Sequence, residues 1–292
     1  AHARFWYEKG TVDEAKLKAA ATTARNEFDA TIYPKLHAAM GRDPLSDAGP
    51  HRFKDERGLP TQWGDGGDGR PDFYLVSDWR RGGGAETVAY PPACQATPGF
   101  VALGAGSLGW GTTPALRNAV AHEYFHLIQL SYAVKGGCDT RGIDEATATW
   151  AMDLAYPNDD WETRPLYQTQ WQLERGMGQG YADWPFFFYL ARTRGNATIR
   201  TIWQQMASHA PWEAVDQAVG SLAATFQAFA VYLWNQDSFD DFDLAEHGHI
   251  LPGTKPRSRA LDDPQQPPVP GSWAVVNAMN NADPSSSGMY AK

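Results

Sequence analysis

The chain has 292 residues and a mass of 32.2 kDa, enough for one large hydrophobic core or two moderate ones. Hydrophobic residues make up 42% and charged residues 20%, as in ordinary globular proteins. A net charge of −9 argues against nucleic acid or an anionic membrane surface as a partner. The longest apolar run, residues 226–234, is too short to span a bilayer.

The first predicted element is a helix over residues 11–41. Thr11 or Asp13 can cap its start, its interior is rich in Ala, and Gly41 follows its end. Pro34 lies inside this run and cannot donate a backbone hydrogen bond, so we expect it to break or kink the helix.

Loops and short strands are expected next. Residues 42–70 are rich in Gly, Asp and Pro, which predicts a loop. Residues 73–76 and 99–103 are apolar and bounded by turn residues, which predicts two strands separated by the turn region at 82–84. The first third of the chain is therefore expected to be mixed α/β and to contain a sheet.

Helices are expected over most of the chain from residue 112 to residue 235. Thr112 or Thr113 can cap the first of them, and Pro114 suits its first turn. This helix is apolar on several sides, so we expect it to be buried and to end at Gly136 and Gly137. The later helices are expected from about 144 to 156, 181 to 194, 197 to 208, 211 to 219 and 222 to 235.

This order of elements predicts an α+β fold. We expect an α/β part over residues 1–135 that includes the buried helix, and a mainly helical part over residues 136–250. The remaining residues, 251–292, are rich in Pro, Ser and Asp and predict an irregular tail or linker, with one strand-like segment at 273–276. The sequence does not indicate an oligomeric state.

The two cysteines, Cys94 and Cys138, do not form a Cys-x-x-Cys pair, so they do not predict a cysteine-liganded zinc. We favour a disulfide between them, which would place the protein outside the cytoplasm, secreted or extracytoplasmic. Two unrelated buried thiols are the alternative. The chain begins at Ala1 and not at Met, which is typical of a processed or excised piece.

The sequence His-Glu-Tyr-Phe-His at positions 122–126 predicts a zinc site and its catalytic base. Residues four apart lie on one helix face, roughly 6 Å apart at Cβ, so His122 and His126 can share a tetrahedral metal. Glu123 lies about 100° around the same helix, where its carboxylate can take a proton from a water activated by the metal. Two satisfied core histidines are the alternative interpretation, but such groups are costly to bury without partners.

A catalytic zinc needs a third protein ligand and an open fourth position. A third His is absent six residues after His126, where the chain has Tyr132. Glu145 follows after eighteen intervening residues, enough to end one helix, turn, and start an antiparallel one beside the histidines. Glu145 is therefore the predicted ligand, with Asp144 as the substitute, although an acid at a helix start is also favoured by the helix dipole alone.

These residues, within 121–128 and 143–150, resemble the gluzincin metallopeptidases, the clan of thermolysin and the zinc aminopeptidases. A weaker likeness to the hyicolysin-type secreted bacterial peptidases extends through 28–34 to 72–76. The resemblance implies zinc-dependent peptide hydrolysis. It also implies a zincin fold, in which a mixed sheet and an active-site helix lie above a mainly helical subdomain with the zinc between them.

The sequence departs from this clan at two places. Thermolysin-like sequences carry an Asp four residues after the ligand Glu that orients a zinc histidine, but Thr149 stands here. Asp153, one turn further on, could orient the histidine instead. The aminopeptidases carry a glutamate that grips the substrate's amino terminus, whereas the segment 104–109 contains no acid. This difference favours an endopeptidase.

An oxyanion donor is expected opposite the zinc. Tyr181 is the first choice, because residues 180–190 resemble the segment that carries the transition-state tyrosine of the aminopeptidases; an ordinary helix-start aromatic is the alternative. His209 is the weaker choice. His247 and His249 are expected in a surface loop.

Asp65, Asp68 and Asp72 lie in a Gly-rich loop and could hold calcium, although the terminal Glu of the usual calcium loop is missing and an acidic turn gives the same pattern. The strand at 99–103 could be a sheet edge that pairs with an extended peptide, although any central strand would have the same sequence pattern. The resemblance, together with the departures from it, therefore implies a zinc endopeptidase acting on proteins or peptides. A zinc aminopeptidase and a binding module for glycan or protein that keeps the scaffold without turnover are the alternatives.

Overall fold

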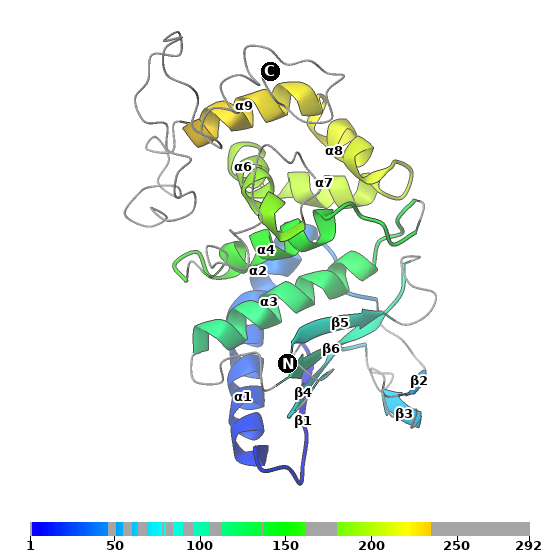
Figure 1. Cartoon of the computed structure of the whole chain (residues 1–292), viewed down its shortest axis with the longest axis vertical. Coiled ribbons are helices and arrows are strands. Elements are labelled where there is room, and N and C mark those ends of the chain that lie inside the picture. Colours follow the sequence, from blue (N-terminus) through cyan, green and yellow to red (C-terminus); the bar gives the residue numbers. More distant parts are fainter. Residues whose placement is uncertain are drawn as a thin grey trace, which may run out of the picture.

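The architecture is α+β, with a mixed four-stranded sheet followed along the chain by a mainly helical region (Figure 1). None of the helices in the described part of the chain is long and apolar enough to cross a membrane. The computed structural model describes residues 2–45, 51–54, 60–63, 69–77, 79, 84–89, 96–104, 113–135, 137–159, 161 and 180–234.

The sheet has the strand order β1-β4-β6-β5. The first three strands run parallel to one another, and β5 runs antiparallel to β6. The strands predicted at 73–76 and 99–103 are confirmed as β4 and β6. Of the two places considered for β6, edge or centre, the structure shows the inner one. The edge beside it belongs to β5, a strand that the sequence did not predict. The strands are β1 (Arg4–Tyr7), β4 (Asp72–Val76), β5 (Ala85–Ala89) and β6 (Gly99–Gly104).

Helices occupy the predicted regions, with differences at their ends. The region 42–70, predicted as a loop, also contains an antiparallel pair of short strands, β2 (His51–Lys54) and β3 (Pro60–Trp63). The helices are α1 (Glu14–Glu27), the π-helix η1 (Phe28–Ile32), α2 (Tyr33–Met40), α3 (Thr113–Leu130), α4 (Ile143–Ala155), the 3₁₀ turn η4 (Gly180–Asp183), α6 (Trp184–Arg194), α7 (Ala197–Gln205), α8 (Pro211–Val219) and α9 (Leu222–Trp234).

The expected irregularity at Pro34 takes the form of a π-helical turn. The segments α1, η1 and α2 follow one another without a break, and Gly41 ends the run with a left-handed φ of 65°. Pro lacks an N–H and its ring collides with the carbonyl four residues earlier, so one wider turn accommodates it without ending the helix. Phe28 in this turn is fully buried and stacks edge-on against Phe73 of the sheet and Tyr124 of α3.

The two faces of the sheet pack differently because side chains alternate along each strand. Phe73, Leu75, Val101 and Leu103 belong to the main core beneath the helices, whereas Phe100 and Ala102 form a smaller cluster on the opposite face. Gly99 allows the close approach of the sheet to α3: a Cβ there would lie 2.6 Å from the Val88 carbonyl oxygen and 2.9 Å from Leu130 Cδ1.

The helices α3 and α4 form an antiparallel pair. Arg117 and Asn118 near the start of α3 donate hydrogen bonds to Asp159 just beyond α4, and Gln129 near the end of α3 donates to Asp144 at the start of α4. Figure 1 shows α3 between the sheet and the helical region. Side chains on the facing sides of α3 and α4 therefore lie at the junction between the sheet and the helical region.

The end of α3 differs from the prediction, because the helix stops at Leu130 and not at Gly136 and Gly137. The Leu130 carbonyl accepts a hydrogen bond of 2.9 Å from the backbone N–H of Thr97, just before β6. A partner from a distant segment replaces the helix's own donor there, which no local sequence signal predicts.

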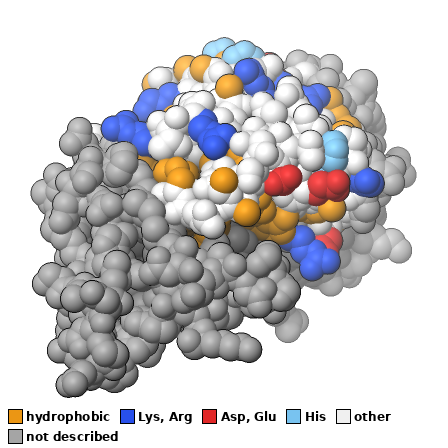
Figure 2. Space-filling model, turned by 90° about the horizontal axis from the view of Figure 1, so that it is seen from above, with side chains coloured by type: hydrophobic (Ala, Val, Ile, Leu, Met, Phe, Trp, Pro, Cys, Tyr) orange, Lys and Arg blue, Asp and Glu red, His pale blue; other side chains and the backbone are white. Residues whose placement is uncertain are grey.

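The helices α7 and α8 turn their apolar side chains inward. Ile199, Ile202 and Trp203 are buried at the three- and four-residue spacing of one helix face. Seen from the end of the molecule that carries α8 and α9, the described surface has hydrophobic side chains in small groups between polar and charged ones (Figure 2). Burial of these faces, and not an intrinsic preference for helix, accounts for most of the stability of such short helices.

Candidate metal centre

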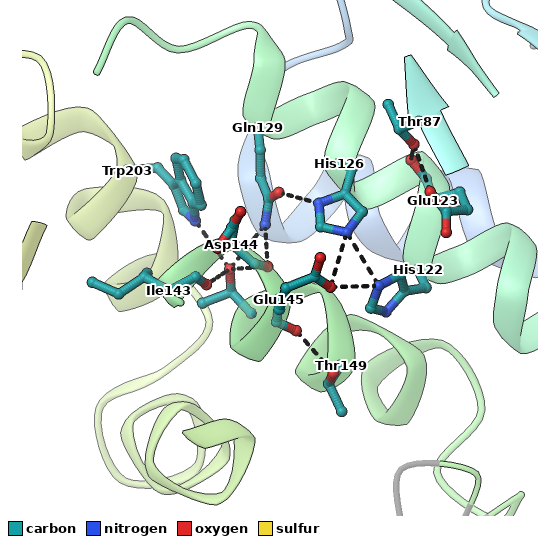
Figure 3. A network of polar contacts seen from close by, with 11 residues as sticks. Thr87, His122, Glu123, His126, Gln129, Ile143, Asp144, Glu145, Thr149 and Trp203 are labelled. Carbon is teal, nitrogen blue, oxygen red and sulfur yellow. Dashed lines mark hydrogen bonds and ion pairs between the residues drawn. The ribbon is translucent and has the colours of Figure 1, made fainter. Parts of the chain in front are cut away.

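His122 and His126 of α3 and Glu145 of α4 come together at the junction between the two helices (Figure 3). The two Nε2 atoms lie 3.1 Å apart, and Glu145 Oε2 lies 3.1 Å from His122 Nε2 and 3.4 Å from His126 Nε2. The described residues contain no other group of three such side chains with this geometry. The predicted ligand set is therefore assembled in space.

This geometry fits a tetrahedral zinc ion. Two ligand atoms bonded to zinc at about 2.0–2.1 Å lie roughly 3.3 Å from each other, close to the three distances measured here. Two imidazole nitrogens and one carboxylate oxygen also form a donor set typical of catalytic zinc, which leaves a fourth position for water or substrate. His122, His126 and Glu145 would hold the ion.

The core sets the rotation of α3 about its own axis. Tyr124 and Phe125, between the two histidines, are fully buried, and Phe125 packs edge-on against Trp150 of α4. These contacts hold His122 and His126 on the side facing Glu145. The turn into α4 contains two consecutive left-handed residues, Arg141 and Gly142, with φ of 54° and 79°.

The three side chains are strongly coupled by charge. Burial alone would lower the pKa of His126, but its hydrogen bond with Glu145 and the negative charge of that carboxylate outweigh burial and raise the pKa to about 9. Burial would likewise raise the pKa of Glu145, but hydrogen bonds and charge from His122 and His126 hold it well below its usual range. Without a metal, the centre is therefore an ion pair at neutral pH.

This ion pair predicts how the stability of the zinc-free protein depends on pH. The pKa of His126 is above its unfolded value of about 6.5, so its contribution is full below pH 6.5 and is lost as the pH rises through 9. The pKa of Glu145 is lowered, so its contribution is present above about pH 4.5 and is lost as the pH falls. The free energy of unfolding should therefore fall by up to about 3 kcal/mol between pH 6 and 9 because of this pair.

Urea unfolding of chelator-treated protein, compared with a Glu145→Gln variant, checks this prediction. The difference in stability between the two proteins should shrink as the pH rises from 6 to 9. For zinc-loaded protein, the stability difference from Glu145→Gln should instead grow as the pH rises. Zinc binds neutral His126, so the apparent zinc affinity increases with pH. A difference between the two proteins that stays constant over this range would contradict the assigned pairing.

Glu123 lies beside the centre and is held by the edge strand. Thr87 Oγ1 of β5 lies 2.8 Å from the Glu123 carboxylate Oε2 and also 2.8 Å from the Glu123 backbone oxygen (Figure 3). The charge of Glu123 contributes to the raised pKa of His126, so the carboxylate lies within electrostatic reach of the ligand set. The structure thus places the predicted base between the sheet edge and the ligands.

Glu123, His126 and Glu145 line a cavity of about 340 Å³. Tyr181 of η4 lines it, and its ring stacks on His122 with centroids 5.7 Å apart. His209 does not line it; its Nδ1 lies near Ser208 and the Gln205 carbonyl instead. Of the two candidate oxyanion donors, the structure places Tyr181 in the site and His209 outside it. The lining residues are Ala85, Glu86, Thr87, Glu123, His126, Gln129, Leu130, Tyr132, Val134, Cys138, Thr140, Asp144, Glu145, Tyr181 and Trp203.

The residue that orients a zinc histidine was expected to be Asp153, but Gln129 has this position. Gln129 Oε1 lies 2.6 Å from His126 Nδ1, whereas the Nδ1 atom of buried His122 has no hydrogen-bond partner among the described residues. Asp153 therefore holds the Nδ1 atom of neither histidine. A polar residue three positions after His126 on an apolar helix was the signal in the sequence.

Thr149 and Asp144, the two other residues considered near Glu145, each take part in a hydrogen bond to a backbone carbonyl of α4. Thr149 donates a hydrogen bond of 2.8 Å to the backbone carbonyl of Glu145. Asp144 accepts a hydrogen bond at its own backbone carbonyl, and its carboxylate is outside the ligand group. The structure therefore favours Glu145 over Asp144 as the third ligand.

Asp72, the one of the three suggested calcium ligands that the structure describes, is buried and forms an ion pair. Its Oδ1 lies 3.2 Å from Arg4 Nε and accepts a hydrogen bond of 2.7 Å from Trp6 Nε1. This cationic neighbour disfavours calcium at Asp72. Asp65 and Asp68 lie outside the described residues.

Other predictions also fall outside the described part of the chain. Cys94 lies there, so its disulfide with Cys138 stays a prediction. His247, His249 and the tail at 251–292 lie there as well. The boundaries at residues 135 and 250 stay predictions too.

No protein-family model matches the chain, and no curated protein or solved structure shows detectable similarity to it. Only the geometry and chemistry of the site therefore bear on the function.

Proposed function

We propose that the protein is a secreted zinc metallopeptidase with a zincin fold of the gluzincin kind, acting as an endopeptidase. The observation that carries this proposal is the convergence of two histidines and one glutamate at zinc-compatible distances, with Glu123 lining the same cavity as His126 and Glu145. A pair of histidines buried for structural reasons has no need of a third ligand from another helix or of an adjacent carboxylate.

Zinc held by His122, His126 and Glu145 would polarise the scissile carbonyl and make water acidic enough to react. Glu123 accepts the proton of the attacking water and then delivers it to the leaving amine. Thr87 holds the Glu123 carboxylate by its hydroxyl group before the reaction. Tyr181, stacked on His122, would donate a hydrogen bond to the developing oxyanion.

The edge strand β5 suits an extended peptide. It has one neighbour in the described sheet, β6, and Ala85, Glu86 and Thr87 line the cavity next to Glu123. A peptide that adds to this edge would form main-chain hydrogen bonds irrespective of its side chains. We propose that the substrate backbone runs along β5 and passes the metal centre.

Glu86 bears on the choice between an endopeptidase and an aminopeptidase, because it is an acid on the edge strand. Side chains alternate along a strand, so Glu86 lies on the opposite face from Thr87, which contacts Glu123. Its Oε2 accepts a hydrogen bond of 2.9 Å from Trp79 Nε1. This orientation does not suit a group that grips a substrate amine beside the metal, and it favours cleavage of internal bonds.

Metal analysis and cleavage of a peptide library with blocked amino termini test the proposal. We expect close to one zinc per chain and cleavage of internal bonds in blocked peptides. A chelator should abolish this cleavage and added zinc should restore it. Cleavage of unblocked peptides alone would show an aminopeptidase, and bound zinc without any hydrolysis would indicate a binding module.

A further inference from the structure

The side chain of Gln129 links the two helices that supply the metal ligands. It comes from α3, one turn after His126, and it is 95% buried, with a relative exposure of 5%. Its Oε1 lies 2.6 Å from His126 Nδ1, and its Nε2 lies 2.8 Å from the Asp144 carbonyl and 3.0 Å from Thr147 Oγ1 (Figure 3).

The partners of Gln129 determine the orientation of its amide. The backbone carbonyl of Asp144 can only accept a hydrogen bond, so the NH₂ group of Gln129 must face it. The Oε1 atom of Gln129 must then face His126 and accept a hydrogen bond from Nδ1. One proton of His126 therefore lies on Nδ1. Once the other proton leaves Nε2, the Nε2 lone pair lies on the side of His122 and Glu145.

Thr147 completes the network without ambiguity. Its hydroxyl donates to the Ile143 carbonyl at 2.7 Å, which leaves its oxygen to accept hydrogen bonds from Gln129 Nε2 and Trp203 Nε1. The indole of Trp203 is a donor only, so the direction of each bond is consistent. Both polar atoms of the Gln129 amide thus have hydrogen-bond partners.

We propose that Gln129 is the positioning residue of the metal centre. It fixes His126 with Nε2 toward the metal, and it sets the register between the histidines of α3 and Glu145 of α4. Asp144 and Thr147 lie on either side of Glu145 in the chain, so the same amide that orients one ligand also locates another. This inference rests on the proposed zinc site.

An amide has an advantage over a carboxylate at this position. It orients His126 without adding a negative charge to a cavity that already contains Glu123, Asp144 and Glu145. A carboxylate could accept from His126 but could not donate to the Asp144 carbonyl, and two acceptors would then face each other. The Nδ1 atom of His122 has no such hydrogen bond among the described residues. Gln129 is therefore the side chain that orients a ligand histidine through its outer nitrogen.

Replacing Gln129 by Met tests the role, because Met has a similar volume but cannot form either hydrogen bond. We expect the zinc dissociation constant, measured by competition with a chromophoric chelator, to rise about 10- to 100-fold. Gln204→Met, the same change at an exposed position of α7, should leave the constant unchanged. Thr147→Val, which removes one anchor of Gln129 without touching His126, should weaken zinc binding by a smaller factor and replaces the first variant if that fails to fold.

A spectroscopic measurement separates positioning from a general loss of structure. In zinc-loaded protein with ¹⁵N-labelled histidine, His126 should show a slowly exchanging Nδ1 proton, which Gln129→Met should lose while far-UV circular dichroism stays unchanged. Zinc affinity of both variants within twofold of the wild type would overturn the assignment to Gln129 and leave the zinc site intact. A wild-type protein that does not compete for zinc would instead overturn the proposed function, and this inference with it.

Discussion

Replacing Glu123 by Gln should lower the rate of peptide hydrolysis by about 10²- to 10⁴-fold while the zinc content stays unchanged. Gln has nearly the same shape as Glu but cannot accept the proton of the attacking water. The ligands His122, His126 and Glu145 are not altered. Thr87 can still donate to the amide oxygen, so the side chain should keep its place beside β5.

The measurement is kcat on an internally quenched peptide, with zinc counted by mass spectrometry in the same sample. Glu86→Gln is the matched control: it makes the same chemical change in another residue beside the cavity, one whose side chain lies on the opposite face of the sheet. We expect that variant to stay active. Full activity of Glu123→Gln would show that another group is the base.

Replacing Glu145 by Ala should remove the metal. Only two of the three ligands, the histidines, would remain. The loss of zinc affinity should therefore exceed the roughly 100-fold loss caused by removing a residue that only orients a ligand. The variant should also lose the two largest causes of the raised pKa of His126, the hydrogen bond and the charge of Glu145.

Zinc content after dialysis against a weak chelator gives the result. Asp144→Ala is the control, because its carboxylate lies outside the ligand group and its backbone carbonyl, which Gln129 contacts, survives the change. We expect this control to keep its zinc. If zinc stayed in Glu145→Ala and left Asp144→Ala, the third ligand would be Asp144.

The two predictions differ in what they remove. The change at Glu123 should abolish chemistry and keep the metal, and the change at Glu145 should abolish both. A binding module on the same scaffold would lose metal in the second variant but would have no activity to lose in the first. Together they distinguish a zinc enzyme from a zinc-stabilised fold.

The sequence predicted those features that depend on local spacing. His122 and His126 are four residues apart, and the period of the helix alone places them on one face. Pro34 imposes a local irregularity because it lies inside a continuous helical run, and Gly41 can end a helix in a left-handed conformation. The positions of β4, β6 and most helices also follow from local patterns, because apolar periodicity and turn residues are properties of neighbouring positions.

Other features depend on partners far away in the chain. The strand β5 contains Thr87, which holds Glu123, but its five residues become a strand only by pairing with β6. The end of α3 depends on Thr97, which captures the Leu130 carbonyl. No periodicity encodes such contacts.

The metal centre shows both kinds of information. Spacing alone indicated the pair of histidines, their base, and a glutamate within reach on a following helix. The tertiary structure decided that Glu145 and not Asp144 faces the pair, that Tyr181 and not His209 enters the cavity, and that Gln129 takes the place expected for Asp153. The physical reason is that a ligand's distance from its own neighbours is fixed by helix geometry, whereas its orientation depends on how two helices pack against each other.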